Sequence, residues 1–434
     1  MTLREALTLL FKRAIALYFR EIEVVGPLPE ATTRGRIFGA NHTNGIVDPV
    51  LVLTQIPCAI SPIAKSTLWD IPGLRWLLDV ANAVPIVRRR DNPGKSKAEN
   101  DEVFDRIAAH LAVGGNVLIF PEGTSHNEPH LLDLKSGVGR MLARARGTAD
   151  AKGLTFQAVG LEFDARTVFR SRALLVFGPV RGIDAIDKTG DDLALAITDR
   201  LRRDLSELLV EGATWDERRL VARVAQMFAN DAGNHTLAGW NEVGRRVEDA
   251  RAALSPGDAL YERVRAEVGA YYEELEAWGL GDDQLVQKIE GFTRPPARAA
   301  RSVVLALALP LALLGLLLYW LPYQLPRLVV RFSRGTDDVV STYKLGTGLL
   351  VFPLFATIYA GVALATLPVP LALVAGVASV LSAFAALAWS ERSARIHGSI
   401  KLMASRPRIA ALRDRREGVM RLLREARARL EPTA

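Results

Sequence analysis

The sequence is poor in cysteine, with Cys58 as the single example among 434 residues. One cysteine excludes an internal disulfide framework and any zinc site built from several cysteines. The composition also differs from that of a disordered or collagen-like chain, because hydrophobic residues make up 49% and charged residues 24%. We therefore expect an ordered chain with more than one structural unit.

Charged residues are missing from two long stretches, residues 302–326 and 345–390. A helix needs about 20 apolar residues to cross a bilayer. The second stretch therefore has room for two crossings, whereas Pro310 interrupts the first, and a proline inside a helix kinks the backbone. Arginine or lysine residues flank both stretches on each side, and positive flanks favour the cytoplasm.

An even number of crossings keeps all of these positive flanks in the cytoplasm. The sequence thus predicts an integral membrane protein with a C-terminal membrane hairpin. Its parts are spans at 345–367 and 371–389, preceded by a re-entrant segment at 302–321. Three full crossings are one alternative, and buried helices of a soluble protein are another.

The net charge of +7 is concentrated at the C-terminal end. Residues 391–434 contain twelve Lys/Arg and five Asp/Glu, which accounts for the whole excess. A protein that binds nucleic acid through its body would be basic beyond its tail, so no nucleic-acid partner is expected. We expect a basic cytoplasmic tail that forms a helix, either attracted to anionic lipid headgroups or simply solvated.

The pattern of the remaining chain changes along its length. Short β-rich runs alternate with helical ones, which predicts an α/β domain with a central sheet. The runs expected to be strands are 37–40, 84–87, 117–120, 156–163 and 173–177, and those expected to be helices between them are 100–113 and 137–146. An amphipathic helix is expected before this domain, lying on the bilayer surface or docked on the protein. The predicted regions are 1–25 (interfacial helix), 26–190 (sheet domain), 191–300 (soluble helices), 301–390 (membrane) and 391–434 (tail).

The first polar motif runs from His42 to Asp48 and follows a predicted strand. Histidine can accept a proton near neutral pH, and a carboxylate beside it can fix its tautomer and stabilise the imidazolium. His42 would then deprotonate a hydroxyl as that hydroxyl attacks. Asp48-Pro49 also has the pattern of a helix start, with aspartate as the cap and proline as the first helical residue. A surface histidine and a purely capping aspartate are therefore the alternatives.

Three further motifs also follow predicted strands. Arg88 begins a run of three arginines, and guanidinium groups bind phosphate oxygens in a bidentate manner. Glu122 precedes Gly123, whose backbone freedom can aim N–H groups at an anion. Thr124 adds a hydroxyl to this turn, and Lys135 adds a positive charge downstream. A looser fourth motif combines a strand near 159–163 with an arginine pair at 170 and 172. Taken singly, each motif also fits an ordinary turn or a solvated edge.

Together, in this order and spacing, the four motifs resemble the glycerolipid acyltransferase superfamily of the PlsC type. Residues 42–48 resemble motif one of that family, 85–88 motif two, 120–124 motif three and, more loosely, 159–163 motif four. Five residues separate His42 from Asp48, where the common family pattern has four. This longer spacing is similar to that of the fungal-type glycerol-3-phosphate/dihydroxyacetone-phosphate acyltransferases.

The resemblance implies an acyltransferase domain that moves a fatty acyl group from acyl-CoA or an acyl carrier protein to glycerol-3-phosphate or a related phosphorylated glycerol. It implies no metal or other cofactor, and membrane lipids are expected as partners. The positive flanks of the apolar stretches predict a catalytic domain that faces the cytoplasm. His42 is then the general base, oriented by Asp48. The residues that it implies near the acceptor phosphate are Arg88, Glu122, Gly123, Thr124 and Lys135. Because a carboxylate repels phosphate, we expect Glu122 to brace Arg88 or the loop. Acylation of lysophosphatidate and a non-catalytic membrane scaffold are the alternatives.

Overall fold

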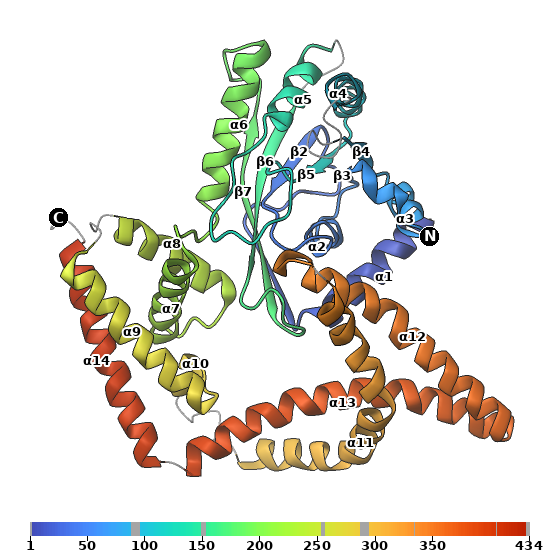
Figure 1. Cartoon of the computed structure of the whole chain (residues 1–434), viewed down its shortest axis with the longest axis vertical. Helices are drawn as coiled ribbons and strands as arrows, with labels where there is room; N and C mark the ends of the chain where they lie inside the picture. Colours follow the sequence, from blue (N-terminus) through green and yellow to red (C-terminus); the bar gives the residue numbers. More distant parts are fainter. Residues whose placement is uncertain are drawn as a thin grey trace. The chain divides into compact units, whose positions relative to one another are not determined.

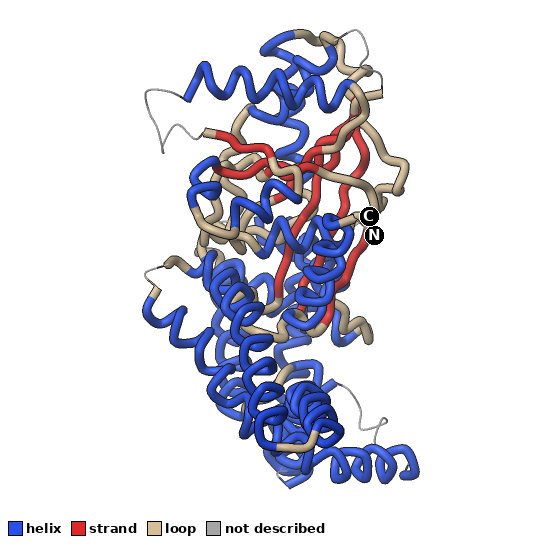
Figure 2. Tube along the Cα trace, turned by 90° about the vertical axis from the view of Figure 1, so that its right-hand side faces the viewer, coloured by secondary structure: helices blue, strands red, loops and turns tan. Residues whose placement is uncertain are grey.

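The computed structural model describes residues 2–87, 96–148, 153–252, 257–286, 295–333, 335–404 and 406–430. The chain forms two compact units (Figures 1 and 2). The first, here called the sheet unit, comprises Met1–Arg219, Thr236–Glu248 and Gly335–Thr342. The second, here called the helical unit, comprises Leu220–His235, Asp249–Arg334 and Tyr343–Ala434. Each is described by itself below.

The sheet unit is built on seven strands, drawn in red in Figure 2. They are β1 (Glu21–Val25), β2 (Arg36–Ala40), β3 (Ser61–Lys65), β4 (Val84–Ile86), β5 (Val117–Ile119), β6 (Thr155–Phe163) and β7 (Arg172–Gly182). Their order across the sheet is β1-β7-β6-β2-β5-β3-β4. All neighbouring strands pair in parallel except β6 and β7. The predicted α/β domain with a central sheet is confirmed.

Several helices accompany the sheet. They are α1 (Leu3–Tyr18), α2 (Val47–Gln55), η1 (Ser66–Asp70, a 3-10 helix), α3 (Leu74–Val80), α4 (Ser96–Ala112), α5 (Gly137–Arg146) and α6 (Gly190–Ser206). The apolar sides of α4, α5 and α6 form one core with β2 and β6, in which Leu111, Met141, Leu201 and Phe156 are fully buried. This core explains why the strands read as nearly continuous apolar runs, since a sheet covered by helices has few solvent-facing positions.

The close packing of α5 against α6 depends on Gly139. A Cβ atom at this position would lie 1.9 Å from the backbone oxygen of Ala194. No side chain can occupy that space without moving one helix, so the glycine is required for the two helices to approach.

The helical unit holds the remaining elements. They are α9 (Ala259–Trp278), α10 (Asp282–Val286), α11 (Pro295–Phe332), α12 (Val340–Thr366), α13 (Val369–Ala404) and α14 (Arg406–Leu430), while α7 (Trp215–Asp231), α8 (Leu237–Ala252) and α12 contribute residues to both units. Among the residues that the structure describes, three segments are long and apolar enough to cross a membrane: Ala306–Phe332, Asp337–Thr366 and Val369–Ser393. By the length and composition of these helices, the chain is a membrane protein.

The predicted hairpin spans, 345–367 and 371–389, lie in α12 and α13, which are separated by a short turn at 367–368. The segment expected to be re-entrant lies in α11, which stays helical through Pro310 and is a third span by length. A Cβ atom on Gly315 of α11 would lie 2.0 Å from the backbone oxygen of Ser382 in α13, so these two helices are in close contact. Length alone does not distinguish two crossings from three, and the number of crossings stays a prediction.

The region predicted as the basic tail contains the end of α13 and the whole of α14, and α14 is not a simply solvated helix. Arg416 is only 7% exposed and donates from Nε to Asp282 Oδ1 at 2.8 Å. Arg424 pairs with Asp231, and Arg415 pairs with Glu274 on α9. Several of the arginines that suggested an interaction with lipid headgroups therefore bind carboxylates of the helical unit itself. The attraction to anionic lipids stays a prediction for the others.

Candidate active site

The carboxyl ends of parallel strands meet at one edge of the sheet. β2 is parallel to both β5 and β6, so the loops that follow these three strands lie together. His42 follows β2, Glu122 follows β5, and Arg166 follows β6. In an open α/β sheet, this edge is where ligands usually bind, and three of the four sequence motifs converge on it.

His42 and Asp48 are in contact despite the extra residue between them. His42 Nδ1 lies 3.0 Å from Asp48 Oδ2, and the same oxygen accepts the backbone N–H groups of Thr43 (2.8 Å) and Asn44 (2.7 Å). The carboxylate is fully buried, whereas the imidazole is 18% exposed and stacks on the ring of Phe120 at 4.1 Å. Since the carboxylate can only accept, Nδ1 carries the ring proton and Nε2 keeps its lone pair.

The predicted capping role of Asp48 is wrong. Helix α2 begins at Val47 with Ile46 as its N-cap, so Asp48 and Pro49 lie inside the first turn. An N-cap side chain would accept from N–H groups further along the helix. Asp48 instead accepts from Thr43 and Asn44, which precede the helix. Its side chain therefore closes the loop that carries His42.

Glu122 braces the same loop from the side of β5. It is 3% exposed, and its Oε1 accepts the backbone N–H of His42 at 2.7 Å. Its Oε2 accepts the backbone N–H of Leu132 at 2.9 Å and contacts His126 Nε2. A further backbone bond runs from His126 N to His42 O at 3.2 Å. Both carboxylate oxygens are thus occupied by donors within the protein, in agreement with the expectation that Glu122 braces a loop rather than meeting phosphate.

The other predicted phosphate ligands lie around the turn after Glu122. Gly123 has φ +77°, but its own N–H donates to Phe120 O at 3.0 Å and so closes the turn. The Thr124 hydroxyl donates to Ser125 O at 3.1 Å. Lys135 is exposed, and a Cβ on Gly123 would lie 3.5 Å from its Cγ, so its stem covers the turn. Arg88 lies outside the described residues, although β4, which precedes it, ends at the same edge of the sheet.

Two further residues belong to this edge: Arg166, which the motifs did not single out, and Asn44, which lies inside the first motif. Arg166 donates from Nη1 to Thr43 O at 2.9 Å and also binds the Asn127 side chain. Burial, with a contribution from nearby Arg218, lowers the pKa of Arg166. Both amide atoms of Asn44 are buried without a hydrogen-bond partner among the described residues. The position of Arg166 just after a buried strand was the available signal, but a single arginine there is not specific.

The arginine pair of the fourth motif has a structural role. Arg170 has φ +66°, and its Nη1 donates to Leu17 O at 3.1 Å. The last carbonyl groups of a helix have no partner within the helix, so Arg170 caps the carboxyl end of α1. Arg172 binds Asp164 through Nε at 3.0 Å and stacks over the ring of Trp240.

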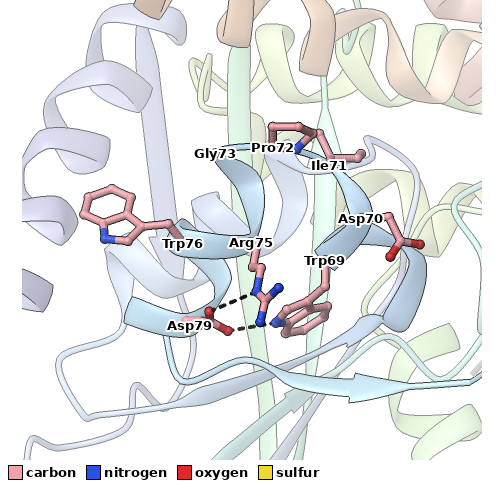
Figure 3. Close-up of a pocket in the computed structure, with 8 residues that line it drawn as sticks. All are labelled: Trp69, Asp70, Ile71, Pro72, Gly73, Arg75, Trp76 and Asp79. Atoms are coloured by element: carbon pink, nitrogen blue, oxygen red, sulfur yellow. Dashed lines mark hydrogen bonds and ion pairs between the residues drawn. The ribbon is translucent and has the colours of Figure 1, made fainter.

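A pocket of about 430 Å³ lies elsewhere, on η1 and α3 (Figure 3). Its lining includes Trp69, whose Nε1 donates to Asp79 Oδ1 at 2.8 Å, and Arg75, whose Nε lies 3.9 Å from Asp79 Oδ2. None of the predicted site residues that the structure describes lines it. Within the described ranges, no group of three or more His, Cys, Asp or Glu side chains is placed to hold a metal ion.

Comparison with known proteins agrees with the assignment that the motifs suggested. Residues 21–160 match the family model described as Acyltransferase. The chain contains an acyltransferase-family domain. The resemblance inferred from the four motifs is thereby confirmed, and the matched region includes β1–β5, most of β6 and the loops of His42 and Glu122.

Two curated relatives are yeast enzymes. Glycerol-3-phosphate O-acyltransferase 2 of Saccharomyces cerevisiae is 24% identical over 286 residues, which cover 61% of this chain and 38% of the yeast protein. Glycerol-3-phosphate O-acyltransferase 1 of the same yeast is 23% identical over 279 residues, covering 60% of this chain and 37% of that protein. The chain thus spans less than two fifths of the length of either relative. A solved structure, the 1-acyl-sn-glycerophosphate (LPA) acyltransferase PlsC from Thermotoga maritima, matches with a TM-score of 0.34 and 18% identity, over 47% of this chain and 80% of that one.

Proposed function

We propose that this chain transfers a fatty acyl group from an acyl thioester, acyl-CoA or an acylated carrier protein, to a hydroxyl of glycerol-3-phosphate or a related phosphorylated glycerol. The observation that carries the proposal is the 3.0 Å contact between His42 Nδ1 and the buried Asp48 carboxylate. It lies in a domain that matches the acyltransferase family model. The choice of acceptor is supported by the two yeast relatives, which are named for glycerol-3-phosphate.

His42 acts as the general base in this proposal. Asp48 holds the proton on Nδ1, so Nε2 can take the proton of the acceptor hydroxyl as its oxygen attacks the thioester carbonyl carbon. The carbon–sulfur bond then breaks, the thiolate leaves, and the imidazolium returns a proton to it. The reaction needs no covalent enzyme intermediate, since the thiolate is already a good leaving group.

The acceptor phosphate is proposed to bind beside the turn at Gly123. Lys135 offers a positive charge there, and its stem lies over the turn. Arg88 would add a bidentate guanidinium at the end of β4. Thr124 contributes its hydroxyl once it exchanges its bond to Ser125 O for the phosphate. Glu122 acts indirectly, because its carboxylate fixes the backbone that carries His42.

The membrane helices suit this chemistry because the acyl product is a lipid, whereas the acceptor is soluble. The helix α1 supports placement at the bilayer surface: Leu3, Leu10 and Leu17 form an exposed apolar stripe, 54%, 54% and 40% exposed, while Ile15 and Tyr18 are buried on the protein side. Positive flanks around the candidate spans support a further part of the proposal, that the catalytic domain faces the cytoplasm. Protease protection of tagged membrane vesicles tests this orientation, which fails if the sheet unit is shielded when the cytoplasmic face is exposed.

The decisive experiment measures transfer of radiolabelled acyl chains by the purified full chain in detergent micelles. Glycerol-3-phosphate and lysophosphatidate are offered separately, with wild type and His42→Ala. We expect transfer to glycerol-3-phosphate by the wild type and a loss of about 100-fold or more in kcat for His42→Ala, in line with the size of general-base catalysis.

A matched control is His130→Ala, because His130 is exposed and lies in the same part of the chain. It should retain wild-type activity. Equal transfer by wild type and His42→Ala would show that His42 is not the base. Transfer to lysophosphatidate alone would correct the acceptor while keeping the chemistry.

A further inference from the structure

A segment far along the sequence packs on the loop of His42. Residues Gly335–Thr342 belong to the sheet unit, although they directly precede the rest of α12. They include η3 (Asp337–Val339) and the first residues of α12. Asp338 is 4% exposed and Ser341 is fully buried. The segment is therefore an integral part of the sheet unit rather than a surface linker.

Its polar side chains bind the loops that carry the candidate site. Thr342 Oγ1 accepts the backbone N–H of Ile46 at 3.0 Å. Asp338 accepts the hydroxyl of Ser125, in the loop after Glu122. Ser341 Oγ donates to the backbone oxygen of Arg166 at 2.6 Å. Through these three bonds, one short segment contacts the loops after β2, β5 and β6.

The contact falls on Gly45 and Ile46, in the loop between His42 and Asp48. Gly45 has φ +51°, in the left-handed region that favours glycine. A Cβ atom there would lie 2.7 Å from Thr342 Oγ1 and 3.0 Å from Asp338 O. A side chain at position 45 would therefore be strained by the backbone and would collide with the segment, so the loop needs glycine where the segment packs on it.

We propose that Thr342 and Asp338 are positioning residues for the acyl transfer, a role that rests on the proposed function. Thr342 holds Ile46 N, which is two residues from Asp48, and Asp338 holds Ser125, which is three residues from Glu122. Asp48 and Glu122 are in turn the two side chains that bind His42. The segment therefore fixes both supports of the imidazole, and its residues 337–342 are the first residues of the candidate membrane span Asp337–Thr366.

The test compares Thr342→Val with Thr342→Ser. Valine keeps the shape of threonine but cannot accept the N–H of Ile46, whereas serine keeps the hydroxyl. We expect Thr342→Val to lower kcat by about 10-fold to 100-fold, because small errors in the placement of a base are costly. The KM for glycerol-3-phosphate should stay within about 2-fold, since the segment acts on the base rather than on acceptor binding. Thr342→Ser should recover most of the activity.

A matched control is Thr357→Val, the same substitution on the same helix, where the hydroxyl donates to Pro353 O within that helix. It should retain wild-type kcat and KM. Asp338→Ala tests the second contact independently and should also lower kcat with little change in KM. Thermal denaturation of each variant in detergent reports whether the fold survives, so that kcat is compared between folded proteins.

The outcomes separate this inference from the proposed function. Full activity of both Thr342→Val and Asp338→Ala overturns the positioning role while His42→Ala still tests the chemistry. A lower melting temperature with unchanged kcat also overturns it, because the segment would then act on stability alone. Equal loss in Thr342→Val and Thr342→Ser contradicts the hydrogen bond as the cause. No acyl transfer by wild type to either acceptor overturns the proposed function and the positioning role with it.

Discussion

Two buried polar clusters, one in each unit, both contain a buried aspartate and a buried asparagine but differ in which polar atoms are left without a hydrogen-bond partner. In the sheet unit, Asp48 and Glu122 surround the imidazole of His42, which stays 18% exposed. Asp48 Oδ1 and both amide atoms of Asn44 are buried without a partner in the described part of the chain. Such groups are rare in folded proteins because each costs free energy.

The cluster in the helical unit saturates its hydrogen bonds. Asp282 Oδ1 accepts from Tyr271 Oη at 2.7 Å and from Arg416 Nε at 2.8 Å. Asp282 Oδ2 accepts from Asn230 Nδ2 at 2.9 Å, and Arg416 Nη1 lies 3.3 Å from Asp231 Oδ1. Burial and the charge of Asp282 raise the pKa of Tyr271. Burial alone would lower the pKa of Arg416, but its bonds to Asp282 and Asp231 raise it.

The difference indicates two purposes. A cluster that joins helices gains stability by satisfying every donor and acceptor. A cluster that performs chemistry must keep some capacity for a substrate, and it accepts a cost in stability to do so. Substitutions in the cluster of the helical unit should therefore lower stability, and substitutions in the cluster of the sheet unit should lower activity.

The largest effect is expected for Asp48→Asn. Asparagine can still accept N–H groups through Oδ1, so the loop should keep its shape, but it carries no charge to stabilise an imidazolium. We expect kcat to fall by about 100-fold or more while the melting temperature changes little. Steady-state kinetics and thermal denaturation on the same sample measure the two quantities.

The control is Asp133→Asn, because the Asp133 side chain is 94% exposed. Asp133→Asn should change neither kcat nor the melting temperature. Two results for Asp48→Asn would contradict this prediction: a kcat within 3-fold of wild type, or a loss of folded protein without loss of specific activity. Either result would mean that the cluster of the sheet unit is structural, and the two clusters would then not differ in role.

Much of the fold was predictable because burial on both faces makes most strands apolar runs. β2, β5 and β6 follow this rule and were expected near their observed bounds. β1 was not expected, because its two glutamates interrupt the apolar pattern at the edge of the sheet. β3 was also missed, since Ser61–Lys65 has proline and lysine in a run of five.

The candidate site was predictable where its residues are local in sequence. His42 and Asp48 are six residues apart, so their contact could be expected from spacing and chemistry. The roles of Arg166 and Thr342 could not be predicted from the sequence. Arg166 binds the His42 loop from 123 residues away in the sequence, and Thr342 binds it from 296 residues away. Single polar residues carry no pattern that predicts such long-range contacts. The predicted start of helix α2 was also wrong. Asp48 lies in the first turn of α2, and the Asp48 side chain closes the His42 loop instead of capping the helix.

An intermediate effect is expected for Arg416→Ala, compared with Arg415→Ala next to it. Removing Arg416 leaves Asp282 as a buried carboxylate without its guanidinium partner, which typically costs about 3–5 kcal/mol. Arg415 forms a half-exposed pair with Glu274 at 2.8 Å, and such pairs contribute about 1 kcal/mol or less. We expect thermal denaturation to show a drop of roughly 10 °C for Arg416→Ala and a few degrees at most for Arg415→Ala.

The activity per folded molecule should be the same in both arginine variants, because neither residue belongs to the candidate site. Equal melting temperatures would mean that the buried pair of Arg416 and Asp282 contributes no more to stability than the half-exposed pair of Arg415 and Glu274. A selective loss of kcat in Arg416→Ala would mean that the cluster of the helical unit also supports the chemistry, and the contrast would then be wrong.

The smallest effect is expected from acid titration of Asp231 in the helical unit. Burial alone would raise the pKa of this carboxyl, but Arg424 and Arg416 lower it below its ordinary value of 3.8. A lowered pKa means that the folded state favours the charged form, so the stabilisation is complete above pH 3.8 and is lost as the pH falls through the folded value. Because the side chain is 35% exposed, water weakens the interaction, and we expect Asp231→Asn to cost about 1 kcal/mol or less. Melting temperatures of wild type and Asp231→Asn should therefore differ slightly at pH 6 and converge below pH 3.8. A difference that grows on acidification would mean that the arginines do not stabilise the charged carboxylate, and that the cluster is less saturated than its geometry indicates.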